Sequence, residues 1–185
     1  MRKPETPYLA ADVIIELVDR PGRPVVLVER KNPPPGWAIP GGFVDRGETL
    51  ENAAVREARE ETCLEVRLKA LLGVYSDPRR DPRQHTVTPV FIGEAVGEPK
   101  AADDASKVAI VEAGRWPEPL AFDHAQILAD YLVFRESGRP RPVGDPPRQP
   151  PIASVAERGR AMTDYLVLRE STSPKPEDSG QKEAI

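Results

Sequence analysis

The 185-residue sequence contains one cysteine, two histidines and no long apolar run. The single Cys63 excludes an intramolecular disulfide framework and a cysteine-rich zinc site, because both need several thiols. His85 and His124 are the only two histidines, so the sequence offers few ligands for a histidine-based metal site. Nowhere do 18 consecutive apolar residues occur, so no membrane span is expected. Since residues 1–7 also lack the apolar stretch of a signal peptide, we expect a soluble protein of the reducing cytoplasm.

An excess of positive charge is absent too. The 26 Lys and Arg residues face 30 Asp and Glu residues, for a net charge of −4 and a sequence pI near 5.4. A broadly basic surface is the usual basis of non-specific nucleic-acid binding, so a nucleic acid is not an expected partner. Apolar residues make up 39% of the chain, which is enough to build a sizeable core.

Proline is the residue in excess, at 22 of 185 positions, against roughly 5% in average proteins. Eight of these prolines lie in residues 140–176 and four in residues 33–40, so the excess marks segments and not the whole chain. We interpret residues 1–137 as the folded domain. Residues 138–185 are then a helical extension, with a Pro-rich linker, one helix over about 153–170 and a polar tail.

The first 137 residues alternate between strand and helix patterns. Apolar runs predict strands at 9–18, 25–29, 65–75, 86–96 and 107–112, with short strand pieces around a glycine corner at 37–44. The turn at 19–22 should join the first two strands in a hairpin. Helix formers predict a helix from the N-cap Thr49 to about Thr62, and a second helix, capped by Asp123, over 123–136. The predicted fold class is a mixed α/β (α+β) domain.

The sequence DYLVFRES at 130–137 nearly recurs as DYLVLRES at 164–171, 34 residues later. A helical solenoid needs about three repeats or more, so chance or duplication of one helix is the simpler explanation. The second copy falls in the predicted 153–170 helix and is strongly apolar at 165–168. We expect it to dock on its own domain or on a partner subunit.

The first predicted helix carries an unusual glutamate cluster. At about 100° per residue, Glu57, Glu60 and Glu61 fall on the side that also bears the apolar positions 50, 53, 54 and 64. Clustered glutamates usually form a solvated face. Carboxylates on a core-facing side are costly unless something compensates their charge. A divalent cation is the simplest compensation, and carboxylates without His or Cys favour Mg²⁺ or Mn²⁺. Arg56 can also lean on this cluster.

The spacing around this helix is specific. Gly42 and Glu48 are separated by five residues, Glu48 and Arg56 by seven, and Glu57, Glu60, Glu61 and Leu64 follow. This pattern resembles the Nudix box of the Nudix hydrolases, Gly-x5-Glu-x7-Arg-Glu-U-x-Glu-Glu-x-Gly-U, where U is bulky and apolar. Ala58 is small for the first U, and Cys63 replaces the last glycine. That glycine ends the helix with a positive φ, which a cysteine adopts with a strain of roughly 1 kcal/mol.

The resemblance implies a Nudix fold over about residues 8–137, with a mixed sheet sandwiched between helices. It also implies hydrolysis of a nucleoside diphosphate linked to another moiety, with Mg²⁺ or Mn²⁺ as cofactor. By the same resemblance Glu57, Glu60 and Glu61, together with Gly41, bind the metal, Glu48 assists, and Arg56 orients the carboxylates. Cations on the phosphates would orient a water, and a carboxylate would take its proton. That base is left open among Glu48, Glu61, Glu98, Asp103 and Asp104.

Segment 73–85, with residues 103–105 and 120–124, resembles the short ADP-ribose pyrophosphatases of bacteria and archaea. Its arginines could hold a diphosphate by charge-assisted bonds, or pair with aspartates of their own loop. Trp37 could stack on a base or belong to the core. The expected substrate contacts are Arg79, Arg83, His85, Trp37 and Asp104, whereas His124 is interpreted as a helix-start residue.

The preferred activity is the conversion of ADP-ribose to AMP and ribose 5-phosphate by a homodimer. The alternatives are another nucleotide substrate (an oxidised nucleoside triphosphate, a dinucleoside polyphosphate or NADH) and a Nudix domain that senses a nucleotide without hydrolysing it. Every glutamate of the box is present, which favours an enzyme.

Overall fold

The computed structural model describes residues 5–102 and 105–140. Within them lie, in chain order, β1 (Tyr8–Leu17), β2 (Val25–Arg30), β3 (Trp37–Ala38), β4 (Gly41–Phe43), α1 (Leu50–Thr62), β5 (Arg67–Tyr75), β6 (Thr86–Ala95), β7 (Ala105–Val111) and α2 (His124–Ser137). The predicted strands and both helices are confirmed, with ends shifted by one or two residues. Asp103 and Asp104 lie outside the described residues. So do the predicted linker from residue 141 onward, the 153–170 helix with its echoed sequence, and the tail.

Strand β1 is the centre of a seven-stranded mixed sheet, whose main order is β3-β2-β1-β6-β5. Along one edge β1 pairs in parallel with β6, from Tyr8↔Thr86 to Leu17↔Ala95. Along the other edge its first half pairs with β4 and its second half with β2, both antiparallel, so the predicted hairpin is confirmed. Strand β7 extends β2. Because β4 occupies half of an edge of β1, the glycine corner is fixed to the sheet shortly before α1 begins.

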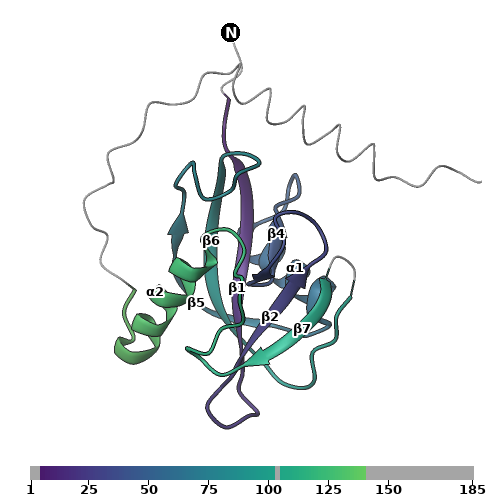
Figure 1. The fold of residues 1–185 in the computed structure, drawn as a ribbon, viewed down its shortest axis with the longest axis vertical. Coiled ribbons are helices and arrows are strands. Elements are labelled where there is room, and N and C mark those ends of the chain that lie inside the picture. Colours follow the sequence, from purple (N-terminus) through teal and green to yellow (C-terminus); the bar gives the residue numbers. More distant parts are fainter. Residues whose placement is uncertain (1–4, 103–104, 141–185) are drawn as a thin grey trace, which may run out of the picture. The chain divides into compact units, whose positions relative to one another are not determined.

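The two helices cover opposite faces of the sheet (Figure 1). Successive side chains of a strand point to opposite faces. Accordingly Val13 and Ile15 of β1 pack in the core that contains the alanines of α1, whereas Ile14 packs with Ile127 and Tyr131 of α2. The predicted sandwich of a mixed sheet between helices is confirmed. In the part of the chain that the structure describes, neither helix is long and apolar enough to cross a membrane.

Helix α1 begins and ends as its sequence predicts. The Thr49 hydroxyl accepts the Asn52 backbone N–H at 3.2 Å, which satisfies one of the open donors of the first turn. At the other end Cys63 has φ +58°, and its N–H donates to the Arg59 carbonyl at 2.8 Å. A non-glycine residue therefore occupies the left-handed position that ends the helix, as expected from the departure in the box.

Replacing Cys63 by glycine should stabilise the protein by about 0.5–1 kcal/mol. Glycine relieves the left-handed strain, and this gain exceeds the extra freedom that it gives the unfolded chain. Cys63 is exposed, so the change removes no core contact. Urea denaturation measures the effect, and Cys63→Ser, which keeps the Cβ, serves as control. Equal unfolding free energies for the glycine and serine variants would contradict the strain argument.

Asp123 is the N-cap residue of α2, as predicted, but it does not cap the helix with its side chain, which makes no capping hydrogen bond. Instead the carboxylate accepts two bonds from Arg80, from Nε at 3.0 Å and from Nη2 at 2.8 Å. A bidentate charged pair is stronger than a bond to a neutral amide. This pair ties the loop before β6 to the start of α2.

Candidate active site

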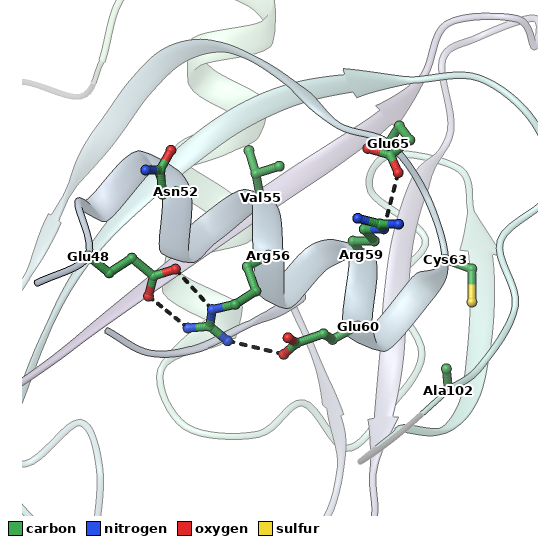
Figure 2. Close-up of a pocket in the computed structure, with 9 residues that line it drawn as sticks. All are labelled: Glu48, Asn52, Val55, Arg56, Arg59, Glu60, Cys63, Glu65 and Ala102. Atoms are coloured by element: carbon green, nitrogen blue, oxygen red, sulfur yellow. Dashed lines mark hydrogen bonds and ion pairs between the residues drawn. The ribbon is translucent and has the colours of Figure 1, made fainter. Parts of the chain in front are cut away.

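Arg56 gathers three glutamates of the box. Its Nε and Nη2 each donate to one oxygen of Glu48 at 2.9 Å. Its Nη1 donates to Glu57 Oε1 at 2.9 Å and to Glu60 Oε2 at 3.1 Å. Figure 2 shows Glu48 and Glu60 meeting Arg56 from opposite directions along α1. A further bond, from Nη2 to the Phe43 carbonyl at 3.1 Å, joins the helix to β4. Arg56 therefore pairs with the glutamate cluster, as the sequence predicts.

The glutamates differ in burial. The side chain of Glu57 is 18% exposed and that of Glu60 is 45% exposed. Glu61 is half-buried, and its Oε2 accepts the Gly41 backbone N–H at 3.0 Å. The prediction of a core-facing position is therefore correct for Glu57 and Glu61 and wrong for Glu60. The reason is that the buried positions Ala54, Ala58 and Thr62 turn the core face of α1 away from Glu60.

Burial sets the protonation of these acids. It raises the pKa of Glu61 to about 8, with the Glu57 and Asp12 charges adding to the effect. Burial also raises the pKa of Glu57, although its bond to Arg56 opposes the shift. The pKa of Glu48 is lowered, because both its oxygens accept from Arg56. Two carboxylates of the cluster are thus held where their negative charge is unfavourable.

At the glycine corner the backbone of Gly41 and Gly42 lies close to acidic side chains. A Cβ added at Gly42 would lie 2.4 Å from the Glu57 carboxyl carbon, and one added at Gly41 would lie 2.2 Å from Asp12 Oδ1. Asp12 is itself buried, and burial raises its pKa to about 7. Only glycine therefore lets the chain approach this closely. The approach encloses a set of oxygen atoms on acidic side chains.

Such an all-oxygen set fits a hard divalent cation such as Mg²⁺ or Mn²⁺. Arg56 occupies one oxygen of Glu57 and one of Glu60. Among residues 5–102 and 105–140, no three His, Cys, Asp or Glu side chains already converge on a single metal position. The bonds of Arg56 account for this, since they draw Glu57 and Glu60 toward the guanidinium.

A hollow of about 610 Å³ lies along the outer side of α1 (Figure 2). Glu48, Arg56 and Glu60 form part of its wall, whereas Glu57 and Glu61 do not line it. At the far end Arg59 pairs with Glu65 at 3.2 Å beside the exposed Cys63. The box therefore has open space on the Glu60 side.

The predicted substrate residues are placed in several different settings. The guanidinium of Arg79 donates to both oxygens of Asp77 at 3.0 and 2.7 Å, and its side chain is 66% exposed. His85 Nε2 lies 3.2 Å from the Ser76 carbonyl oxygen. These are contacts of an ordinary polar loop, the alternative that the sequence left open. Trp37 packs against the core on the α2 side, and Asp104 lies outside the described residues.

Arg83 belongs to a different group. Its guanidinium donates to the two oxygens of Asp81 at 3.0 and 2.8 Å and lies 5.2 Å from the centre of the Phe122 ring. The guanidinium of Arg30, from the end of β2, lies 4.6 Å from the same ring. Both distances are typical of cation–π contacts. We call Arg30, Arg83 and Phe122 the arginine–phenylalanine group.

Arg30 has bonding capacity to spare. Its Nε donates to the Pro34 carbonyl at 3.0 Å and its Nη2 to the Pro33 carbonyl at 3.5 Å, so both of these bonds go to neutral backbone oxygens. Burial and the neighbouring Arg83 lower its pKa, and the charge of Glu61 acts in the opposite direction. Arg30 thus lies beside Arg83 and within electrostatic reach of Glu61. Sequence reasoning missed Arg30, because one basic residue at a strand end carries no distinguishing signal.

Comparison with known proteins agrees with the site. The model of the NUDIX domain matches residues 7–132. The ADP-ribose pyrophosphatase of Methanocaldococcus jannaschii is 47% identical over 132 residues, which are 70% of this chain and 75% of that protein. A NUDIX hydrolase from Nitrosomonas europaea superposes with a TM-score of 0.64 at 25% identity, covering 75% of this chain and 77% of that one.

The NUDIX domain of Shewanella oneidensis NrtR, solved with ADP-ribose, superposes with a TM-score of 0.59 at 26% identity, covering 72% and 90% of the two chains. The match over residues 7–132 includes every residue of the box and most of the described fold. The resemblance seen in the sequence is therefore confirmed, and the chain belongs to the Nudix hydrolase family.

Proposed function

We propose that this Nudix hydrolase uses Mg²⁺ to cleave ADP-ribose into AMP and ribose 5-phosphate. The observation that carries the choice of substrate is the 47% identity to the Methanocaldococcus jannaschii ADP-ribose pyrophosphatase over 132 residues. The site supports the chemistry, because the half-buried carboxylate of Glu61 lies within electrostatic reach of Arg30, which has Arg83 as its neighbour. Carboxylates suit a metal, and arginines suit phosphate oxygens.

Glu57, Glu60 and Glu61, with Gly41, would hold the metal. When bound, a divalent cation neutralises phosphate charge and orients the attacking water. Arg56 keeps Glu48, Glu57 and Glu60 in fixed positions, and the Gly41 N–H fixes Oε2 of Glu61.

Among the described candidates for the general base, Glu61 is the best placed. Both oxygens of Glu48 accept from Arg56, which lowers its pKa and its affinity for a proton. Glu98 is paired with Arg20. Glu61 keeps Oε1 outside its bond to the Gly41 N–H, so this oxygen is available to accept the proton of a water.

We propose that the arginine–phenylalanine group binds the diphosphate of the substrate. Arg30→Gln should then raise KM for ADP-ribose by roughly 10–100-fold, because a charge-assisted hydrogen bond contributes about 1.5–3 kcal/mol. Steady-state kinetics measures the change. Arg79→Gln is the matched control, since that side chain is exposed and paired with Asp77. A larger rise in KM in the Arg79 variant than in the Arg30 variant would contradict the assignment.

A substrate panel tests the proposed activity. The protein with Mg²⁺ is incubated with ADP-ribose, NADH, a diadenosine polyphosphate and an oxidised dGTP, and kcat/KM is compared. ADP-ribose should have the highest value. If it ranks among the poorest substrates, the specific proposal is wrong and another Nudix specificity holds. Turnover of nothing in either Mg²⁺ or Mn²⁺ would favour a nucleotide sensor.

We also propose that the protein is a homodimer. Among the described strands β5 pairs only with β6, so one of its edges is open. Leu71 and Val74 of this strand are 49% and 57% exposed. Open edges with apolar side chains readily accept another chain. Light scattering should give twice the chain mass of 20.4 kDa, and a monomer mass at micromolar concentration would contradict the proposal.

A further inference from the structure

His124 is a buried histidine whose ring contacts the segment that leads to the glycine corner. It is the first residue of α2 and only 3% exposed. Its Nδ1 accepts the backbone N–H of Ile39 at 3.0 Å. Ile39 stands two residues before Gly41, in the segment that joins β3 to β4. The ring thus accepts a hydrogen bond from a buried backbone N–H beside the site. Leaving this N–H unpaired would cost free energy.

This contact fixes the tautomer of the ring. Burial lowers the pKa of His124 to about 3, with Arg80 and Arg30 adding to the effect, so the ring is neutral. A neutral imidazole that accepts at Nδ1 carries its proton on Nε2. Nε2 lies 3.7 Å from Asp12 Oδ2. Both ring nitrogens are therefore directed at groups that flank the corner.

Asp12 lies beside Gly41 in the sheet. The two residues are register partners between β1 and β4, and a Cβ on Gly41 would lie 2.2 Å from Asp12 Oδ1. Gly41 in turn donates its N–H to Glu61 Oε2 at 3.0 Å. A continuous chain of contacts therefore runs from His124 through the Ile39–Gly41 backbone to a carboxylate of the box.

The start of α2 that carries His124 is itself anchored. Arg80 is buried and holds Asp123, the residue before His124, by its two bonds. A third bond joins Arg80 Nη1 to Thr88 Oγ1 of β6 at 2.5 Å. The position of the ring is thus set by the sheet as well as by its own helix.

We infer that His124 is a positioning residue, which holds the Ile39 N–H so that the Gly41 N–H orients Glu61 for a divalent cation. The inference rests on the metal-dependent hydrolysis proposed above. His124 does not contact the metal or the substrate in this role. Its effect is carried by the corner backbone, so it depends on an acceptor at the Nδ1 position and not on the imidazole as such.

Two variants with matched chemistry test this role. In His124→Asn the amide oxygen takes the place of Nδ1 and can still accept from Ile39. In His124→Gln the amide reaches the place of Nε2, and the Ile39 N–H loses its acceptor. Mn²⁺ binding to the metal-free protein, measured by electron paramagnetic resonance without substrate, gives the readout. Urea denaturation reports the folded fraction of each variant.

We expect His124→Asn to bind Mn²⁺ within about threefold of the unmodified protein. We expect His124→Gln to bind it about 10–100-fold more weakly, the range typical of residues that orient metal ligands. Its kcat for ADP-ribose should fall in parallel, with KM little changed. A merely structural histidine would lower the unfolding free energy of both variants and leave the Mn²⁺ affinity of the folded protein unchanged.

Equal weakening of Mn²⁺ binding in both variants, or weakening in neither, would overturn the inference. If His124→Gln does not fold, His124→Asn still tests the inference, because weakened Mn²⁺ binding by its folded form would overturn it. Mn²⁺ binding by the unmodified protein without turnover of ADP-ribose would contradict the proposed substrate alone. Absence of Mn²⁺ binding by the unmodified protein would overturn the positioning role as well.

Discussion

Replacing Glu61 by glutamine should lower kcat for ADP-ribose by roughly 10²–10³-fold. The carboxylate is oriented by the Gly41 N–H at 3.0 Å and lies beside Glu57 and Asp12 in a half-buried setting. Losing the charge of a metal ligand, or the proton acceptor of the reaction, costs several kcal/mol in the transition state. Each tenfold in rate corresponds to about 1.4 kcal/mol. Glutamine retains the size of the side chain and an oxygen for Gly41.

The control for this variant is Glu51→Gln, a change of the same type in the first turn of the same helix. Glu51 is exposed and lies outside the gathered glutamates. Its loss should leave kcat within about twofold. Full activity in Glu61→Gln would show that the box glutamates are not assigned correctly, whereas equal losses in both variants would point to a general effect on α1.

Without divalent cations, the protein should lose stability as the pH rises from about 5 to 8. Burial raises the pKa of Glu61 from 4.5 to about 8. In that interval the folded protein binds a proton that the unfolded chain has lost, so the unfolding free energy falls with rising pH. Asp12, with its pKa raised to about 7, acts in the same direction. At about 1.4 kcal/mol per pKa unit, the titration of Glu61 lowers the unfolding free energy by an amount on the order of 3–5 kcal/mol.

Urea denaturation in a chelator across this pH range measures the effect. Glu61→Gln should flatten the slope, because the amide does not titrate. Mg²⁺ or Mn²⁺ should restore more stability at pH 8 than at pH 5, since the cation binds the deprotonated form. An unfolding free energy of the unmodified protein that stays constant or rises between pH 5 and pH 8 would contradict the unfavourable charge inferred for this cluster.

The fold could be predicted largely from local pattern. The helix from Thr49, its cap and the left-handed Cys63 follow from residues close together in the chain, and the structure confirms all three. The contact of Arg56 with the glutamates was predictable for the same reason, because Glu57 and Glu60 follow it on one helix and Glu48 precedes it by only eight positions. The helical wheel failed only at Glu60, since a wheel gives relative angles and leaves the exact core direction open.

Contacts between distant segments could not be predicted. Arg30 and Phe122 are 92 positions apart in the chain, and Ile39 and His124 are 85 apart. Neither pair is marked by a spacing, because the sheet and the start of α2 bring them together. The Arg80–Asp123 pair could not be predicted either: Asp123 is the N-cap residue, but its carboxylate binds an arginine from another loop instead of capping the helix.

The proposed activity is tested most directly by quantifying the products released from ADP-ribose in the presence of Mg²⁺. We predict equal amounts of AMP and ribose 5-phosphate, formed at a rate that a chelator abolishes and Glu61→Gln lowers by roughly 10²–10³-fold. Unchanged ADP-ribose, or products formed at the same rate by the protein and its Glu61→Gln variant, would contradict it.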